Sequence, residues 1–323
     1  MRKVVILPIC AVTILVAVVA ASLLLSARHS PSAPQSGSVN TVPSVAQTTS
    51  GTPPAAPTSS QPASPALEPR PSVAKVFAAG GVRQFIDCRG PASVSALSGP
   101  TLVMIPGLGD GHSTWARVLP ELLKTTRVCV YDRPGIERSP PRASAITADA
   151  GVHARELHAL LDAAGEGGAL VLLGHSYGGP IARAFAGYNP KQVPGVVLLD
   201  SVYPAQWQVD GRYWHEPGAT IDVRASGEVV SAMPTLGRKP LVVMTSGIGE
   251  TALWKREQVP LAQLSQNSEH VMVSESTHAI QRDRPDAVIA AATAVLNAVR
   301  ENHPLPACRS VKALWARHGS ICV

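Results

Sequence analysis

Short apolar runs alternate with longer amphipathic stretches from about residue 73 onward, and this alternation predicts βα units around a largely parallel sheet. The runs are continuously apolar, which is typical of strands that are buried on both faces. We expect these strands at 101–105, 127–131, 169–173, 196–199, 241–244 and 270–273, preceded by an edge strand at 83–88. Apolar residues at helical spacing predict helices at 147–164, 180–188 and 285–299. Residues 73–323 are therefore expected to form one α/β domain, a mostly parallel central sheet flanked by helices.

The segment from about 201 to 239 interrupts this alternation. It is irregular in pattern and contains Trp207, Tyr213 and Trp214 close together. Irregular segments of this length inside a compact domain usually serve a function. We expect a small lid over a site, with aromatic side chains that favour a substrate with an apolar portion.

The N-terminal residues have the pattern of a membrane segment. Arg2 and Lys3 precede an uncharged apolar run from Val4 to Leu25, which is about long enough to cross a hydrocarbon core as a helix. The run exceeds a usual secretory h-region, and Leu25-Ser26-Ala27 matches an A-x-A cleavage site poorly. The positive residues place the rest of the chain outside the cytoplasm. We expect residues 1–28 to anchor the protein in the cell membrane, with secretion after signal cleavage as the alternative.

Residues 29–72 are dominated by Pro, Ser, Thr, Ala and Gln. They contain almost no large apolar side chain whose burial could offset the entropy of ordering. We expect a disordered spacer that its prolines keep extended, between the membrane and the domain.

Composition narrows the class of protein further. Apolar residues make up 45% of the chain but aromatic residues only 4%, so Ala, Val and Leu supply most of the core, as in parallel sheets covered by helices. The formal net charge of +6 is spread thinly and forms no dense Lys/Arg stripe interleaved with aromatic residues. The basic balance therefore predicts no nucleic-acid partner.

Four cysteines lie outside the apolar run, which allows two disulfides in an oxidising compartment. Cys308 and Cys322 flank a short C-terminal segment, and a bridge between them would hold it in place. Cys88 and Cys129 both fall in expected strands, where they are either a second bridge or two buried small apolar residues. Neither pair resembles a metal site, and no cofactor or metal is expected.

The stretch LVLLGHSYGGPIARAFAG is a buried strand that runs into a G-x-S-x-G turn and then into a helix of small residues. In this setting a sharp turn strains the backbone of Ser176 and lifts its hydroxyl above the sheet. Gly174 and Gly178 flank the serine because a Cβ at either position would collide with the neighbouring elements. The helix N-terminus points at the site, so the Tyr177 N–H can donate to an oxyanion. We therefore expect Ser176 to be a nucleophile.

Two further loops supply the partners that a serine nucleophile needs. In TLVMIPGLGDGHSTW a strand ends in a glycine-rich loop, at the chain position where the second oxyanion donor is expected, and the amide of Leu108 is the candidate. In HVMVSESTHAIQRDRPDAV the loop between the last expected strand and the last long helix carries His278. Histidine titrates near neutrality and is therefore suited to act as the base.

With these motifs the chain resembles the α/β-hydrolase superfamily, specifically its serine esterase-like members, from about residue 80 to 300. The resemblance implies an α/β-hydrolase fold, in which the serine, the acid and the histidine follow one another along the chain. RVCVYDRPGIERS also resembles a segment of that family, with its turn at 132–135, although Glu137 stands where a glycine is common. That segment is structural in the family, so no catalytic role is expected there. The PGLG loop departs from the frequent HG pair.

The acid has two candidates. The usual position, after the strand at 241–244, offers Glu250, whereas the preceding strand ends directly at Asp200. Some members of the family resemble the second arrangement. Asp200 follows its strand without a gap and is more rigidly placed to orient an imidazole, so we favour Asp200 and keep Glu250 as the alternative.

The expected function is hydrolysis of an ester, or less often of a thioester or amide, through an acyl-serine intermediate. A serine in the turn argues against the epoxide hydrolases and dehalogenases of this family, whose pattern places an aspartate there. An acyltransferase on the same scaffold is one alternative, since water and another alcohol compete for the same acyl-enzyme. A non-catalytic surface binding module is the other.

Overall fold

The computed structural model describes residues 70–90 and 99–323. Its strands are β1 (Val73–Ala79), β2 (Val82–Arg89), β3 (Thr101–Ile105), β4 (Val128–Tyr131), β5 (Ile146–Ala148), β6 (Leu170–His175), β7 (Gly195–Leu199), β8 (Tyr213–Glu216), β9 (Ala219–Asp222), β10 (Leu241–Ser246), β11 (Ser268–Val273) and β12 (Ser320–Cys322). Its helices are α1 (Leu119–Leu122), α2 (Ala150–Ala163), α3 (Gly178–Tyr188), α4 (Trp207–Asp210), α5 (Val223–Ala232), α6 (Ala252–Ala262), α7 (Ile280–Asp283), α8 (Pro285–Arg300) and α9 (Cys308–Arg317), with a 3-10 turn η2 (His112–Trp115).

The described residues form a nine-stranded sheet in the order β1-β2-β4-β3-β6-β7-β10-β11-β12. The six strands from β4 to β11 in this order run parallel, and they are the six buried strands that the apolar runs predict. The expected edge strand at 83–88 is wrong in one respect. It corresponds to β2, which pairs antiparallel with β4 on one side and with β1 on the other, so β1 is the edge.

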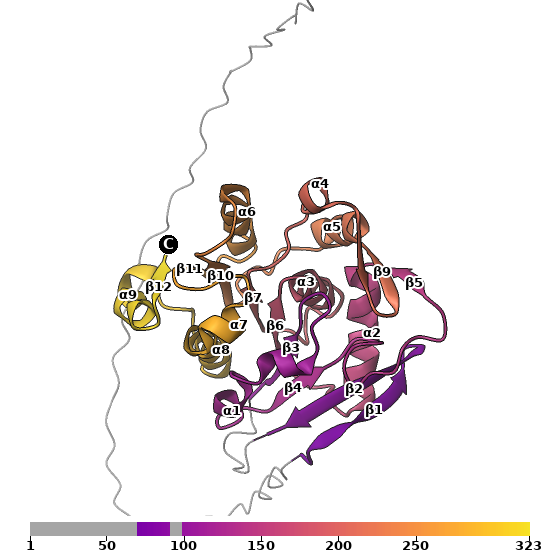
Figure 1. Cartoon of the computed structure of the whole chain (residues 1–323). Coiled ribbons are helices and arrows are strands. Elements are labelled where there is room, and N and C mark those ends of the chain that lie inside the picture. The colour runs from indigo at the N-terminus through magenta and orange to yellow at the C-terminus, as the bar shows by residue number, and fades with distance from the viewer. Residues whose placement is uncertain (1–69, 91–98) are drawn as a thin grey trace, which may run out of the picture. The chain divides into compact units, whose positions relative to one another are not determined.

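Successive residues of the inner strands face two separate apolar cores. In β6, Leu170 and Leu172 belong to the core shared with α2 and α3, whereas Val171 and Leu173 belong to the core shared with α8. Figure 1 shows α2 and α3 on one side of the sheet and α1 and α8 on the other. Burial on both faces explains why these strands are continuously apolar. The fold is therefore the expected α/β sandwich of helices around a mostly parallel sheet.

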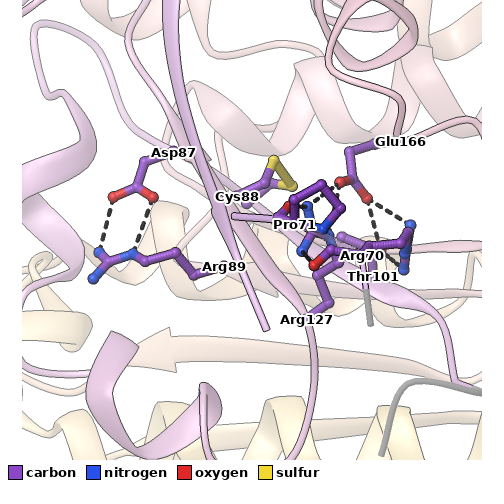
Figure 2. Close-up of a disulfide and its surroundings, with 9 residues drawn as sticks. Arg70, Pro71, Asp87, Cys88, Arg89, Thr101, Arg127 and Glu166 are labelled. Atoms are coloured by element: carbon purple, nitrogen blue, oxygen red, sulfur yellow. Dashed lines mark hydrogen bonds and ion pairs between the residues drawn. A yellow bond between two sulfur atoms is a disulfide. The ribbon is translucent and has the colours of Figure 1, made fainter. Parts of the chain in front are cut away.

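A disulfide joins Cys88 of β2 to Cys129 of β4, which lie directly opposite each other in the two strands. Beside it, the buried carboxylate of Glu166 accepts hydrogen bonds from Arg70, at 2.8 Å, and from Arg127, at 2.7 Å (Figure 2). This pair was expected to be either a disulfide or two buried small apolar residues, and the structure contains the disulfide. Together these contacts fix the start of the domain to its sheet.

The segment 201–239 is more regular than its pattern indicates. It contains α4, the antiparallel strands β8 and β9, and α5, and β9 also pairs with β5 to form a separate three-stranded sheet. Figure 1 shows α4 and α5 beyond the end of α3, on the side of the sheet where α6 also lies. This segment has the position expected of a lid.

The C-terminal segment adds α9 and the short strand β12, which pairs antiparallel with β11. The expected bridge between Cys308 and Cys322 is present and joins these two elements. None of the helices within 70–90 and 99–323 is long and apolar enough to span a bilayer. The expected anchor at 1–28 lies outside the described residues, as does the expected spacer at 29–72 except for its last three residues.

Candidate active site

Ser176 lies in the sharp turn between β6 and α3 with a left-handed backbone, at φ 51°. This conformation is rare for a residue with a side chain and is found where surrounding structure enforces it. The turn is tight because a Cβ added to Gly178 would overlap the carbonyl of Ile105, and one added to Gly174 would overlap the backbone of Gly178. The half-buried serine is thereby held at the end of a buried strand and next to a helix N-terminus.

His278 lies in the loop between β11 and α7, and its Nδ1 is 2.8 Å from Oδ2 of Asp200. With Nδ1–H donating to the carboxylate, Nε2 is the ring nitrogen that can accept a proton. His278 and Ser176 line one cavity of about 560 Å3. Three residues that are far apart along the chain are thus brought to the same end of the parallel strands.

Asp200 directly follows β7 and is fully buried, also with a left-handed backbone at φ 42°. Besides His278, its carboxylate accepts hydrogen bonds from Ser246 N at 3.0 Å, Ser246 Oγ at 2.7 Å and Trp254 Nε1 at 2.9 Å. Burial would raise the pKa of this carboxyl, but the hydrogen bonds that it accepts outweigh burial and lower that pKa. The group is therefore ionised at neutral pH and rigidly held.

Glu250, the alternative acid, also approaches the imidazole. Its Oε1 is 3.6 Å from His278 Nδ1, beyond hydrogen-bonding distance, and its side chain is partly exposed. Burial and the neighbouring Asp200 charge raise the pKa of Glu250. The hydrogen bond to Nδ1 is made by Asp200. Burial would lower the pKa of His278, but the two carboxylates, Asp200 above all, outweigh it and raise that pKa.

The two residues expected to donate to an oxyanion, Leu108 and Tyr177, both lie near the serine. Leu108 lines the same cavity as Ser176, and Tyr177 follows Ser176 directly before α3. Within the described part of the chain, neither amide N–H donates to a protein acceptor. The loop is packed closely here, because a Cβ on Gly107 would come within 3.2 Å of the Ser176 Cβ. Both amides thus lack an acceptor among the described residues, one next to Ser176 in the chain and one in a residue that lines the same cavity.

A family model described as the alpha/beta hydrolase fold matches residues 100–224, a range that holds Ser176 and Asp200. The chain has the α/β-hydrolase fold, and over this range it is similar to members of that superfamily. Its solved relatives include an esterase from Thermogutta terrifontis, which is 19% identical with a TM-score of 0.52 and is matched over 71% of this chain and 99% of that one. At this identity the likeness shows the fold.

Two curated proteins are similar in sequence. The uncharacterized protein YqjL of Bacillus subtilis is 28% identical over 59% of this chain and 81% of its own length. Lipase LipV of Mycobacterium tuberculosis is 36% identical over 42% of this chain, and the match covers only 44% of the lipase. One of these two similar proteins is thus a lipase by name, and the part that it shares with this chain is less than half of that lipase.

Two features of this site carry no signal in a single sequence. The first is His175, the residue before the serine, whose Nε2 is 2.9 Å from the carbonyl oxygen of His278. Burial lowers the pKa of His175 to about 4, so the ring is neutral and Nε2–H can donate to this carbonyl. Gln281 also contacts its Nδ1, at 3.3 Å. His175 thus holds the loop that carries the candidate base.

The second feature is a buried ion pair beside the loop that carries Leu108. Arg133 donates to the carbonyl of Pro106 at 2.8 Å and also to that of Gly107, and it pairs with Glu216 of β8 at 2.8 Å. Glu216 in turn accepts from the amide of Gly109 at 3.3 Å. The turn at 132–135 was expected to be only structural. Its arginine supports the loop that carries Leu108, so it acts on the geometry of the site.

Among the described residues, three groups of side chains have the composition of a metal site. The first contains Cys88 and Cys129 beside Glu166, and its two sulfurs are joined in the disulfide. The second is Asp200, Glu250 and His278. The third is His112, Asp132 and Glu137, in which Nδ1 of the histidine is 2.9 Å from Asp132 and 2.7 Å from Glu137. In each of the two groups that contain a histidine, Nδ1–H donates to a carboxylate, from His112 to Asp132 and from His278 to Asp200. These bonds fasten η2 to the turn at 132–135 in one case and orient His278 in the other.

Proposed function

We propose that this protein is a serine hydrolase that cleaves carboxylic esters through an acyl-serine intermediate. The observation that carries the proposal is the 2.8 Å contact between His278 Nδ1 and Asp200 Oδ2, at the wall of a cavity that also contains Ser176. With Nδ1 of His278 bound to Asp200, Nε2 of the same ring is left to act as the base for the hydroxyl of Ser176.

In the proposed reaction the hydroxyl of Ser176 attacks the ester carbonyl while Nε2 of His278 takes its proton. The imidazolium that forms is stabilised by the ionised Asp200. The carbonyl oxygen becomes negative and accepts hydrogen bonds from the Leu108 and Tyr177 amides. His278 then protonates the leaving alcohol, and water, deprotonated by the same histidine, releases the acid from Ser176.

The cavity favours an ester with an apolar portion. Its walls include Tyr203, Val209, Trp214 and Trp254, and Trp214 comes from the lid. A cavity of about 560 Å3 lies within the range of small-molecule sites, roughly 300 to 1,000 Å3. The names of two relatives, a lipase and an esterase, are consistent with an ester substrate.

We further propose that the domain acts outside the cytoplasm, attached to the cell membrane through residues 1–28. Two disulfides support this, because such bridges persist in oxidising compartments and are rare in the cytosol. A reporter that is active only outside the cytoplasm, fused after Val323, should be active, and the protein should fractionate with membranes. A soluble cytoplasmic protein with free thiols would contradict the proposal.

The decisive test of ester hydrolysis combines substrate and covalent probe. Purified domain should hydrolyse p-nitrophenyl esters with a preference for one acyl length, and a fluorophosphonate should label Ser176 with loss of that activity. Ser176→Ala is the matched control for both measurements. A folded wild-type domain that neither hydrolyses any ester of the series nor reacts with the probe would overturn the proposal.

A further inference from the structure

A second, smaller cavity lies on the far side of Val202 from the candidate active site. It has a volume of about 210 Å3 and is bounded by residues of α3, α5 and α6. Most of its lining is apolar, with Val202, Val230 and Leu261 buried in its wall, whereas Ser231 and Thr235 are exposed at its rim. The cavity therefore reaches solvent between α5 and the segment that follows it.

The one charged side chain among the residues that line this cavity is Arg183 of α3, which is only 6% exposed. Its Nη2 donates to the carbonyl of Val230 at 3.1 Å. Within residues 70–90 and 99–323 its Nη1 has no hydrogen-bond acceptor, and no carboxylate forms a salt bridge with it. Every other buried arginine described above faces a carboxylate.

A buried guanidinium without a counter-charge is energetically unfavourable. Removing an ion from water costs several kcal/mol even after the protein relaxes, and only close opposite charge and hydrogen bonds offset that cost. Burial lowers the pKa of Arg183 to about 10, yet the group stays charged at neutral pH. An arginine in this state, facing an open cavity, is suited to receive an anion from solvent.

We propose that this cavity is a second ligand site that binds a short aliphatic carboxylate, with the carboxylate on Arg183 and the alkyl chain against the apolar wall. The planar guanidinium matches a carboxylate in shape, and charge-assisted hydrogen bonds of this kind are the strong ones. The cavity is smaller than the roughly 300 to 1,000 Å3 of drug-sized sites, so its ligand is a few carbons long.

The second site shares a wall with the first. Val202 lines both cavities, and its amide donates to the carbonyl of Ser176 at 3.1 Å. A ligand on Arg183 therefore contacts the residue that supports the serine turn. The carboxylate ligand could be released by ester hydrolysis at the first site or be supplied from elsewhere. The proposal requires that it binds at Arg183 whichever its source.

Binding is tested on the full-length Ser176→Ala protein, so that the outcome does not depend on ester hydrolysis. Butyrate is titrated by calorimetry at constant ionic strength, with neutral butyramide as the matched ligand control. Butyrate should bind with one-to-one stoichiometry and raise the melting temperature, whereas butyramide should bind far more weakly. The proposal would be overturned if butyrate and butyramide gave equal heats of binding and equal changes in melting temperature, or if butyrate gave neither.

Arg183→Met should weaken butyrate binding by about 10- to 100-fold, the expected loss for hydrogen bonds to a charged group. Arg224→Met is the control, because it removes the same charge from the exposed face of α5, where Arg224 pairs only with Glu228. If Arg183→Met does not fold, Ser231→Trp replaces it, since that change fills the exposed rim and leaves the arginine in place. Undiminished binding in the folded variant would place butyrate elsewhere.

The source of the acid follows from chain length. If the carboxylates that bind most tightly match the acyl groups of the esters that are hydrolysed fastest, the site takes the reaction product. A mismatch assigns it to an acid supplied from elsewhere.

Discussion

Arg133 and Glu216 form an ion pair in the protein interior, with Arg133 Nη2 at 2.8 Å from Glu216 Oε2. The arginine also binds carbonyls of the loop that carries Leu108, and the glutamate belongs to a strand of the lid. Burial would raise the pKa of Glu216, but Arg133 outweighs burial and lowers it, so the pair is charged at neutral pH. The lid and the loop that carries Leu108 are thereby connected through this ion pair, as they are through the bond from the Gly109 amide to Glu216.

We predict that Glu216→Gln lowers kcat by about tenfold or more with little change in KM, because a displaced Leu108 amide weakens only the transition state. The free energy of unfolding should fall by up to about 3 to 5 kcal/mol, the cost of leaving a buried charge unpaired. Glu228→Gln, on the exposed face of α5, is the control and should change neither. Unchanged kcat in Glu216→Gln would show that the ion pair only stabilises the fold.

Ser176→Ala should reduce ester hydrolysis to the background of the buffer and abolish labelling by a fluorophosphonate. The hydroxyl lines the cavity and has no packing role, so the circular dichroism spectrum should match that of the wild type. Steady-state kinetics and labelling on the same preparation check this. Residual activity above a few percent would rule out Ser176 as the nucleophile.

Asp200→Asn should reduce kcat by roughly three to four orders of magnitude, because an amide in this position favours the wrong tautomer of His278 and does not stabilise the imidazolium. Glu250→Gln, a matched change 3.6 Å from the same ring nitrogen, should be mild. Both must be compared on protein of equal circular dichroism, since Asp200 also accepts hydrogen bonds from Ser246 and Trp254. A large loss confined to Glu250→Gln would reverse the assignment of the acid.

The pH dependence of kcat/KM follows from the raised pKa of His278. The base must be neutral, so activity should be lost on the acid side, with a midpoint above the 6.5 of an ordinary histidine. Glu250 is one of the charges that raise this pKa, so Glu250→Gln should move the midpoint to lower pH. A pH–rate profile of both proteins checks the shift, and a wild-type midpoint at or below 6.5 would contradict it.

Removing the Cys88–Cys129 bridge with two alanines should lower the free energy of unfolding by about 4 kcal/mol, as expected for a closed loop with a sequence separation of 41. The same change at Cys308 and Cys322, whose separation is 14, should cost about 3 kcal/mol. Urea unfolding of both variants gives the comparison. Equal stability of the first variant and the wild type would show that the bridge adds nothing to the packed strands.

The sequence predicts the inner strands and the serine turn well, since burial on both faces and a strained turn impose strict patterns on neighbouring residues. It does not predict β1 or β12, because edge strands are partly exposed and their pattern is mixed. Helix α6 is missed because Pro260 lies within it and its amphipathic pattern is weak. Local patterns also say little about the lid, whose strand β9 pairs with β5 from a distant part of the chain.

The residues of the candidate site are likewise predictable from the sequence only in part. Ser176 and His278 stand in loops whose chain positions the fold determines, so they can be found in advance. The choice between Asp200 and Glu250 rests on a difference between 2.8 and 3.6 Å, which no pattern contains. The pair of Arg133 and Glu216 joins residues 83 positions apart, and single-sequence spacing gives no sign of it.

The left-handed backbones of Ser176 and Asp200 set a limit on engineering this protein. Each costs on the order of 1 kcal/mol that a glycine would not incur. Selection for heat resistance alone will therefore favour glycine at the two positions on which the proposed chemistry depends. Stability and turnover should conflict at these residues, so an active variant of higher thermal stability has to gain that stability elsewhere in the fold.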